Sequence, residues 1–211
     1  FMQSLEPLSS AGWTVTFSCR FGDGIITRAR NSICREFLHR VPKSDVLVML
    51  DDDIGWKPPD LVKLIEHKED FVAGLYRYKM DEERYPVRWL NFEIWRDDET
   101  GLWEVETAPA GFIKLTRNCL EKMVAAYPEL EYHDTATDMM AHALFDFELV
   151  DKVYWGEDFT FCRRWRAIGG NVMVDPTITL EHIGKQVYTG NIEDWIKRMP
   201  PSMFIRGEKA A

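Results

Sequence analysis

Three consecutive acids, Asp51, Asp52 and Asp53, follow directly after the apolar run of residues 46–50. An ionised carboxylate at the end of a buried strand is costly unless a cation neutralises it. In a strand, where side chains alternate, Asp51 and Asp53 point the same way, so one divalent cation can lie between them while Asp52 faces elsewhere. The alternative is a solvated acidic turn that leads into the next helix.

A second acidic pair, Glu157 and Asp158, begins a later predicted helix, and His182 ends a later apolar run. Acids in the first turn of a helix often only complement its dipole. In a substrate cleft, however, one of them would be a general base. A lone histidine is more often packed or exposed than a ligand. After a strand of the same sheet, His182 would instead complete the cation site begun by the aspartate triplet.

Strands and helices alternate along the chain. We expect helices over residues 1–11, 27–40 (with Thr27 as N-cap), 59–67, 117–126 and 156–168, and strands over 13–18, 46–50, 71–76, 87–89, 92–95, 102–105, 110–115 and 172–174, the last of which residues 180–184 follow. Residues 97–101 indicate a hairpin turn, and residues 127–154 a long irregular loop. The alternation predicts an α/β fold with a mixed, mainly parallel sheet flanked by helices. Ligands of such sheets bind beyond the carboxyl ends of strands, where the aspartate triplet lies.

Composition sets limits on the function. The chain has 211 residues, of which 45% are hydrophobic and 29% charged, as expected for one soluble globular domain. Its net charge of −9 argues against tight, sequence-independent binding of DNA. Cys19, Cys34, Cys119 and Cys162 show no ligand-like spacing, which favours a reducing compartment. No apolar run reaches ~18 residues, and there is no signal-peptide pattern. We therefore expect no integral membrane segment and a cytoplasmic location, in the host cytoplasm if the protein is viral.

Four motifs, taken in order, resemble a known family. They are Ala29-Arg30-Asn31, Leu50-Asp51-Asp52-Asp53, Gly156-Glu157-Asp158 with the helix that follows, and Asp175-Pro176 with His182. Over residues 13–184 this order resembles the family-2 glycosyltransferases of the GT-A fold, in particular the small soluble members of phages and bacteria. The resemblance implies a Rossmann-like GT-A fold and metal-dependent transfer of a sugar from a nucleotide-diphosphate sugar to an acceptor hydroxyl. Inversion is implied, although related retaining enzymes share the metal motif.

The resemblance also implies roles in metal binding and catalysis. Asp51, Asp53 and His182 would hold Mn²⁺ or Mg²⁺ against the donor diphosphate. Asp158 would deprotonate the acceptor hydroxyl, with Glu157 beside it.

Roles at the donor follow in the same way. Arg30 would contact the nucleotide, and Asp23 would stand in for an acid that reads the base. Asp52 would either support the metal ligands from behind or face the ribose. Arg28 is either a phosphate partner or a surface charge. Gly111 either lets the backbone approach the ligand or serves packing.

In domain terms, the resemblance implies a single domain over residues 1–186. Residues 1–76 would form the nucleotide-sugar half, and residues 77–186 the acceptor half with a small β-hairpin region. Residues 187–211 would be a tail that acts as a lid, packs as a terminal helix or forms a dimer contact. Family members begin with a strand and loop that hold the nucleotide base, and this chain opens after them.

The implied partners are a UDP- or GDP-sugar and an acceptor, which is a glycan, a protein, a lipid-linked sugar or, with more difficulty for so acidic a chain, modified DNA. The oligomeric state stays open. Two readings from other classes also stay open: a catalytically silent module that binds a nucleotide sugar or a glycan, and a metal-dependent nucleotidyltransferase.

Overall fold

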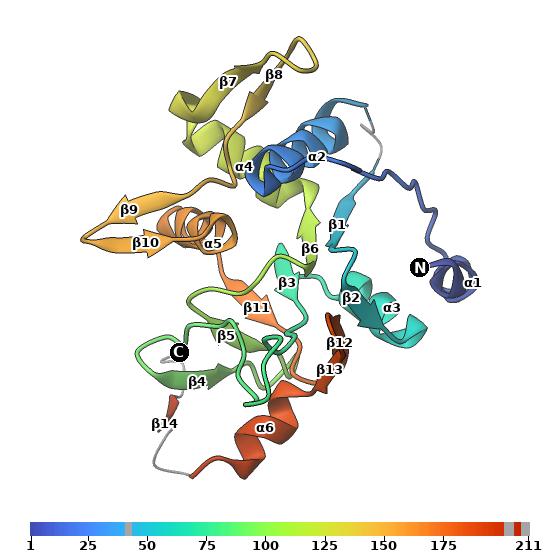
Figure 1. Cartoon of the computed structure of the whole chain (residues 1–211), viewed down its shortest axis with the longest axis vertical. Coiled ribbons are helices and arrows are strands. Elements are labelled where there is room, and N and C mark those ends of the chain that lie inside the picture. The colour runs from blue at the N-terminus through green and yellow to red at the C-terminus, as the bar shows by residue number, and fades with distance from the viewer. Residues whose placement is uncertain (41–43, 201–204, 208–211) are drawn as a thin grey trace.

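The computed structural model describes residues 1–40, 44–200 and 205–207. Its helices are η1 (Met2–Ser4), α1 (Leu5–Ser10), α2 (Ile26–Arg40), α3 (Pro58–Glu66), α4 (Arg117–Ala126), η2 (Pro128–Leu130), α5 (Glu157–Ala167) and α6 (Ile192–Arg198). Its strands are β1 (Val46–Leu50), β2 (Ile54–Trp56), β3 (Phe71–Ala73), β4 (Glu93–Arg96), β5 (Trp103–Val105), β6 (Phe112–Thr116), β7 (Glu131–Asp134), β8 (Met139–His142), β9 (Glu148–Val150), β10 (Val153–Trp155), β11 (Val172–Val174), β12 (Leu180–Ile183), β13 (Val187–Gly190) and β14 (Ile205–Gly207). Figure 1 shows their arrangement.

The central sheet has seven strands in the order β1-β6-β3-β11-β5-β4-β14. The prediction of a mainly parallel, Rossmann-like GT-A sheet is wrong. Among the described residues, only the pairs β3–β11 and β4–β14 of this sheet run parallel, and every other neighbouring pair is antiparallel. Two strands account for this: β5 follows β4 without a helix between them and returns antiparallel to it, and β6 lies between β1 and β3 and runs opposite to both.

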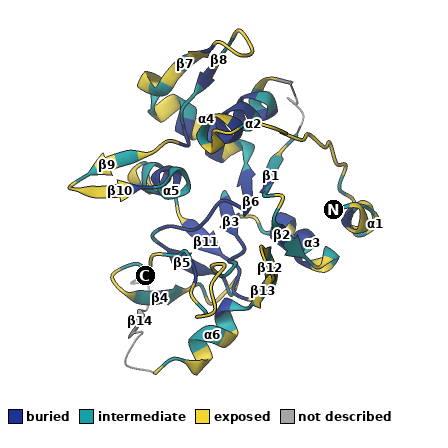
Figure 2. Ribbon diagram, in the orientation of Figure 1, coloured by how far each residue is buried: buried dark blue, intermediate teal, exposed yellow. Residues whose placement is uncertain are grey.

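Both faces of the central sheet are buried. On β3, Phe71 and Ala73 join one hydrophobic cluster and Val72 the other, and β11 alternates in the same way. Buried residues of α2, α4 and α5 belong to the first cluster, and those of α1 and α3 to the second. Figure 2 shows the resulting buried centre over β3, β6 and β11. Alternation of apolar side chains along each strand therefore holds helices against both faces.

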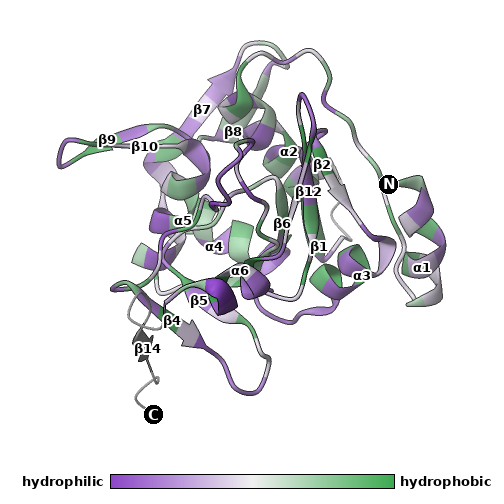
Figure 3. Ribbon diagram, turned by 60° about the horizontal axis from the view of Figure 1, so that its bottom comes forward, coloured by the Kyte–Doolittle hydropathy of each residue, from purple (hydrophilic) through white to green (hydrophobic). Residues whose placement is uncertain are grey.

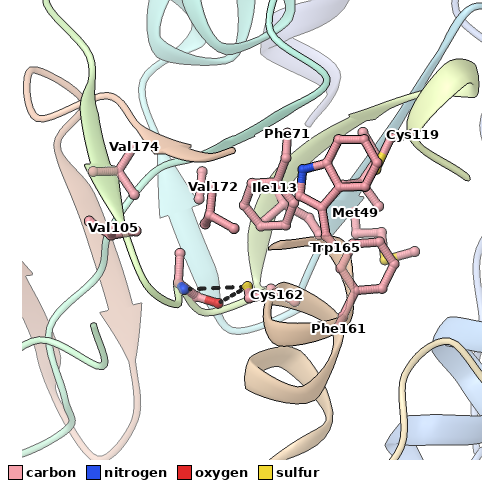
Figure 4. Packing of buried hydrophobic residues seen from close by; sticks show 14 of the residues in the cluster. Met49, Phe71, Val105, Ile113, Cys119, Phe161, Cys162, Trp165, Val172 and Val174 are labelled. Carbon is pink, nitrogen blue, oxygen red and sulfur yellow. Dashed lines mark hydrogen bonds between the residues drawn. The ribbon is translucent and has the colours of Figure 1, made fainter. Parts of the chain in front are cut away.

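In the first cluster, α5 packs its aromatic side chains onto the sheet. Phe161 stacks on Phe145 with ring centroids 4.4 Å apart, and Trp165 is 3% exposed. The Cys162 thiol lies between Ala108 N and Ala108 O, at 3.5 Å from each, as the dashed lines in Figure 4 show. These contacts fix α5, and with it the acids in its first turn.

Sheet register brings the aspartate triplet to a strand junction. Leu50 pairs with Phe112, so the next residue, Asp51, donates its N–H to the carbonyl of Gly111 at 2.9 Å. A separate three-stranded sheet, β13-β12-β2, pairs Ile54 with His182. Asp51 is thereby attached to the central sheet, and Asp53 to the smaller one.

Four local predictions are wrong. Residues 87–89 form no strand, because only Arg88 of this run pairs, in an isolated bridge with Thr107. Residues 13–18 form no strand, and Phe17 is 62% exposed, because no sheet edge lies beside this apolar run. Helix α2 begins at Ile26, so Thr27 lies inside the helix rather than at its N-cap. Residues 127–154 are not one irregular loop but two hairpins, β7–β8 and β9–β10. The second hairpin projects from the body in Figures 1 and 3.

The segment after residue 186 packs on the body as far as it is described. Strand β13 pairs with β12, Ile192 of α6 is fully buried, and the Trp195 ring lies 5.5 Å from that of Tyr85. The rest of the predicted tail, residues 201–204 and 208–211, lies outside the described residues. None of the helices in the described ranges has the length and apolar character that a membrane span requires.

Candidate functional site

Arg30 of α2 lies at the centre of the candidate site and is 5% exposed. Its Nη1 donates to the Ala110 carbonyl and its Nη2 to Asp51 Oδ2, each at 3.0 Å. Its Nε lies 3.4 Å from Glu157 Oε1. Burial alone would lower the pKa of Arg30, but the carboxylates of Asp51 and Glu157 raise it overall. One guanidinium therefore joins three of the predicted motifs.

Asp158 stands beside Glu157 in the first turn of α5. Burial, followed by the charge of Glu157, raises the pKa of Asp158 to about 6. Its Oδ1 accepts from the N–H of Phe159 at 2.8 Å, which fixes the carboxyl group. A partly buried carboxylate with a pKa near neutrality has the properties of a general base.

Gly111 lies against the side chains of both Asp51 and Tyr76. A Cβ at Gly111 would lie 2.7 Å from the Tyr76 hydroxyl and 2.8 Å from Asp51 Oδ2. Burial, followed by the charge of Asp51 and then that of Asp158, raises the pKa of the Tyr76 phenol, so it stays a neutral hydrogen-bonding group. Gly111 lines the site because only a residue without a side chain fits there.

Asp53 has different partners. Its Oδ2 accepts from Lys79 Nζ at 2.6 Å and lies 3.5 Å from His182 Nε2. The other ring nitrogen of His182, Nδ1, lies 2.8 Å from the Arg77 carbonyl. The structure thus brings Asp53 and His182 together, as predicted, but pairs Asp51 with Arg30 instead.

The pair of Asp53 and His182 suits a divalent cation. A carboxylate oxygen and an imidazole nitrogen face each other, and the ring is oriented through its second nitrogen, as in metal-binding histidines. Lys79 already places a positive charge on that carboxylate. Within the described ranges, no group of three His, Cys, Asp or Glu side chains is placed to hold a metal ion. The predicted trio is therefore reduced to a pair, and further ligands would come from substrate oxygens or water.

The remaining predicted residues lie outside this cluster. Asp23, in the loop before α2, pairs with Arg28 in the first turn of α2, with Arg28 Nη2 2.8 Å from Asp23 Oδ1. This bond and the Ile25 N–H lower the pKa of Asp23. Asp52 is exposed. The structure does not bring these three residues to Arg30.

Other residues at the site were not singled out from the sequence. Asn31, next to Arg30, is 3% exposed and exchanges two hydrogen bonds of 2.9 Å with the backbone of Phe145. The sequence does not indicate that Lys79 belongs to the site, because a lone lysine in a charged stretch has no characteristic spacing. Tyr76 follows the end of β3 by three residues, and its hydroxyl lies beside Gly111, as does Asp51 Oδ2.

Two cavities lie in the body of the protein, and of the residues named at this site only Asn31 lines one of them. One, of about 390 Å³, lies between α2, α4 and β8 and includes Leu38, Val124 and Met140 in its lining. The other, of about 570 Å³, surrounds the ends of β1 and β6 nearest Thr116. The candidate site is therefore a convergence of charged groups at the sheet edge rather than a deep pocket.

Comparisons with known proteins add little. No family model matches this chain, and no curated protein matches it. The chain is similar to a solved structure, the crystal structure of A197 from STIV, with 18% sequence identity and a TM-score of 0.48. The match covers 90% of this chain and 84% of that chain. We draw no conclusion about function from it.

Proposed function

We propose that the protein is a glycosyltransferase that moves a sugar from a nucleotide-diphosphate sugar to an acceptor hydroxyl, with inversion at the anomeric carbon. The observation that supports it best is the clustering of three motifs around one buried guanidinium, that of Arg30, which contacts Asp51 and Glu157. These residues come from α2, the end of β1 and the start of α5. Such convergence is expected of a site and not of unrelated surface charges.

The chemistry assigned to this site begins at Asp158. Its carboxylate accepts the proton of the acceptor hydroxyl, whose oxygen attacks the anomeric carbon while the bond to the diphosphate oxygen breaks. Arg30 fixes Asp51 and Glu157 in place, and Gly111 lets the Tyr76 hydroxyl and the Asp51 carboxylate lie close to its backbone. Asp53 and His182 are the residues that would hold Mn²⁺ or Mg²⁺, whose charge stabilises the leaving diphosphate.

The proposed donor is a UDP- or GDP-sugar. The proposed acceptor is a hydroxyl group of a glycan, a protein or a lipid-linked sugar. A polyanionic acceptor fits a chain of net charge −9 least well.

The test is release of nucleoside diphosphate from a panel of UDP- and GDP-sugars with Mn²⁺ and mixed acceptors. We expect Asp158→Asn to lower turnover by roughly 10²- to 10⁴-fold, the usual contribution of a general base. The matched control is Asp98→Asn, because Asp98 is an exposed residue in the turn between β4 and β5. Equal turnover in Asp158→Asn and wild type would contradict the assignment.

A second candidate function is that of a module that binds a nucleotide sugar but does not catalyse its turnover. It is favoured by one observation: both aspartates of the proposed metal motif already pair with protein cations, Asp51 with Arg30 and Asp53 with Lys79. Calorimetric binding of a nucleotide sugar, with no diphosphate released in the presence of acceptors, would favour this module over the enzyme.

A further inference from the structure

The positive charge next to Asp53 is the ammonium group of Lys79. Lys79 Nζ and His182 Nε2 both approach the same atom, Asp53 Oδ2, at 2.6 and 3.5 Å. Lys79 and Asp53 are each about one-third exposed, at 36% and 38% of the side chain. The ammonium therefore occupies a place that a small cation from solvent can also reach.

The tautomer of His182 strengthens the case for a cation at this place. Its Nδ1 lies 2.8 Å from the Arg77 carbonyl, and a carbonyl only accepts hydrogen bonds, so Nδ1 carries the proton. In the neutral ring, Nε2 then presents its lone pair toward the Asp53 carboxylate. Two acceptors that face each other are stable only with a positive charge between or beside them, and Lys79 supplies it.

The loop that carries Lys79 is anchored independently of that contact. Tyr85 packs on Trp195 of α6, and Arg198 of α6 forms an ion pair with Glu83. The Arg77 guanidinium also lies over the Tyr188 ring, 5.7 Å from its centroid. Because these contacts hold the backbone, the flexible lysine side chain can leave Asp53 while the loop stays in place.

We propose that Lys79 competes with a divalent cation for Asp53 and, when the cation binds, moves onto the diphosphate of the donor, an inference that rests on the function proposed above. A divalent cation and an ammonium repel each other at one carboxylate oxygen, so binding of the cation releases Lys79. The released ammonium, on a side chain about one-third exposed, is then free to contact diphosphate oxygens. Cation and diphosphate therefore bind cooperatively, and the cation alone binds weakly.

The test measures Mn²⁺ binding to the full chain by the electron paramagnetic resonance signal of free Mn²⁺, first alone and then with UDP or GDP. Lys79→Met is expected to bind Mn²⁺ alone about three- to tenfold more tightly than wild type, the range for a partly exposed, charge-assisted pair. With Mn²⁺ present, the same variant is expected to bind UDP or GDP more weakly by a similar factor. If Lys79 had only a structural role, its replacement would not raise the affinity for Mn²⁺ and lower the affinity for UDP or GDP.

Three further variants complete the design. Lys79→Arg keeps the charge and should bind Mn²⁺ as weakly as wild type. Lys197→Met removes an exposed lysine of α6 whose partners are Glu193 and Asp194, and should change neither affinity. Asp53→Asn should abolish Mn²⁺ binding.

The outcomes separate this inference from the proposed function. Equal or weaker Mn²⁺ binding in Lys79→Met, with binding still lost in Asp53→Asn, overturns the role of Lys79 and leaves the glycosyltransferase proposal standing. If neither Mn²⁺ nor the diphosphates bind to any variant, both proposals fail. A thermal unfolding curve of Lys79→Met that matches wild type excludes misfolding as the cause.

Discussion

The acids of the site differ in whether they form an ion pair with Arg30. Its guanidinium forms ion pairs with Asp51 and Glu157. Asp158 has no ion pair with Arg30, and burial raises its pKa to about 6, with Glu157 adding to the effect. Neighbouring acids whose pKa values are pushed apart can take different roles. The two anionic acids position Arg30, and Asp158 is left to exchange a proton.

This difference predicts the pH dependence of the proposed reaction. A base must be deprotonated to act, so kcat/KM should rise with pH through about 6 and level off above it. At pH 5 the rate should be about tenfold below the plateau, because only a tenth of Asp158 would be ionised. Diphosphate release measured from pH 5 to 8 checks this, and a flat profile would be inconsistent with Asp158 as the base.

Gly111→Ala tests the close packing of Tyr76 and Asp51 against the backbone of Gly111. The new methyl would meet the Tyr76 hydroxyl at 2.7 Å and Asp51 Oδ2 at 2.8 Å, so at least one of them must move. We expect a loss of about 1–3 kcal/mol in the free energy of unfolding, typical of overpacking, together with most of the activity. Gly24→Ala is the control, because nothing lies within 4 Å of its Cβ position. Urea unfolding of both variants gives the comparison, and equal stability would mean that the site relaxes around the methyl.

The sequence grouped Asp51 with Asp53 and His182, whereas the structure pairs Asp51 with Arg30. Arg30, Asp51, Gly111 and Glu157 come together in the structure. The partner of Asp53 was not predictable, since Lys79 reaches it through a loop whose course depends on α6.

At the scale of elements, helices were predicted better than strand pairing. The apolar spacing of residues 117–126 is a local property, and α4 spans Arg117–Ala126. The direction and neighbours of a strand depend on where the rest of the chain lies, so the antiparallel β1–β6 pair had no local signal. The β9–β10 hairpin was missed because its two turn residues, Asp151 and Lys152, adopt positive φ without the usual glycine.

Asn191 connects α6 to the body and makes a prediction at this scale. Its Oδ1 accepts from the N–H of Asp194 as the helix N-cap. Its Nδ2 lies 3.1–3.2 Å from the carbonyls of Pro176 and Ile178 and the hydroxyl of Thr179. Asn191→Ala should therefore lower the free energy of unfolding by about 1–3 kcal/mol and raise hydrogen exchange over α6.

The control for Asn191→Ala is Lys197→Ala on the exposed side of the same helix. Its ion pairs with Glu193 and Asp194 are solvent-exposed, so the change should cost at most about 0.5 kcal/mol. If hydrogen exchange over α6 rose equally in both variants, Asn191 would not be the anchor.

At the scale of the whole molecule, the two hydrophobic clusters share one sheet and should unfold together. Phe161→Ala in the first cluster should cost about 3–5 kcal/mol, and Leu64→Ala in the second about 2–5 kcal/mol; both residues are fully buried. Each change should shift a single thermal transition seen identically by far- and near-ultraviolet circular dichroism. Two separate transitions, each moved by one variant, would show independent halves.

Because three of the four cysteines are buried, labelling of their thiols reports how fast the core opens. Cys19 is exposed, whereas Cys34, Cys119 and Cys162 are buried free thiols. Burial raises the pKa of Cys34 to about 12 and keeps the other two protonated as well. Because only the thiolate reacts, a maleimide should label one thiol at once and the other three at the pace at which the core opens. Mass spectrometry of the labelled chain would then time unfolding without any denaturant, and rapid modification of all four thiols would contradict the packing around α5.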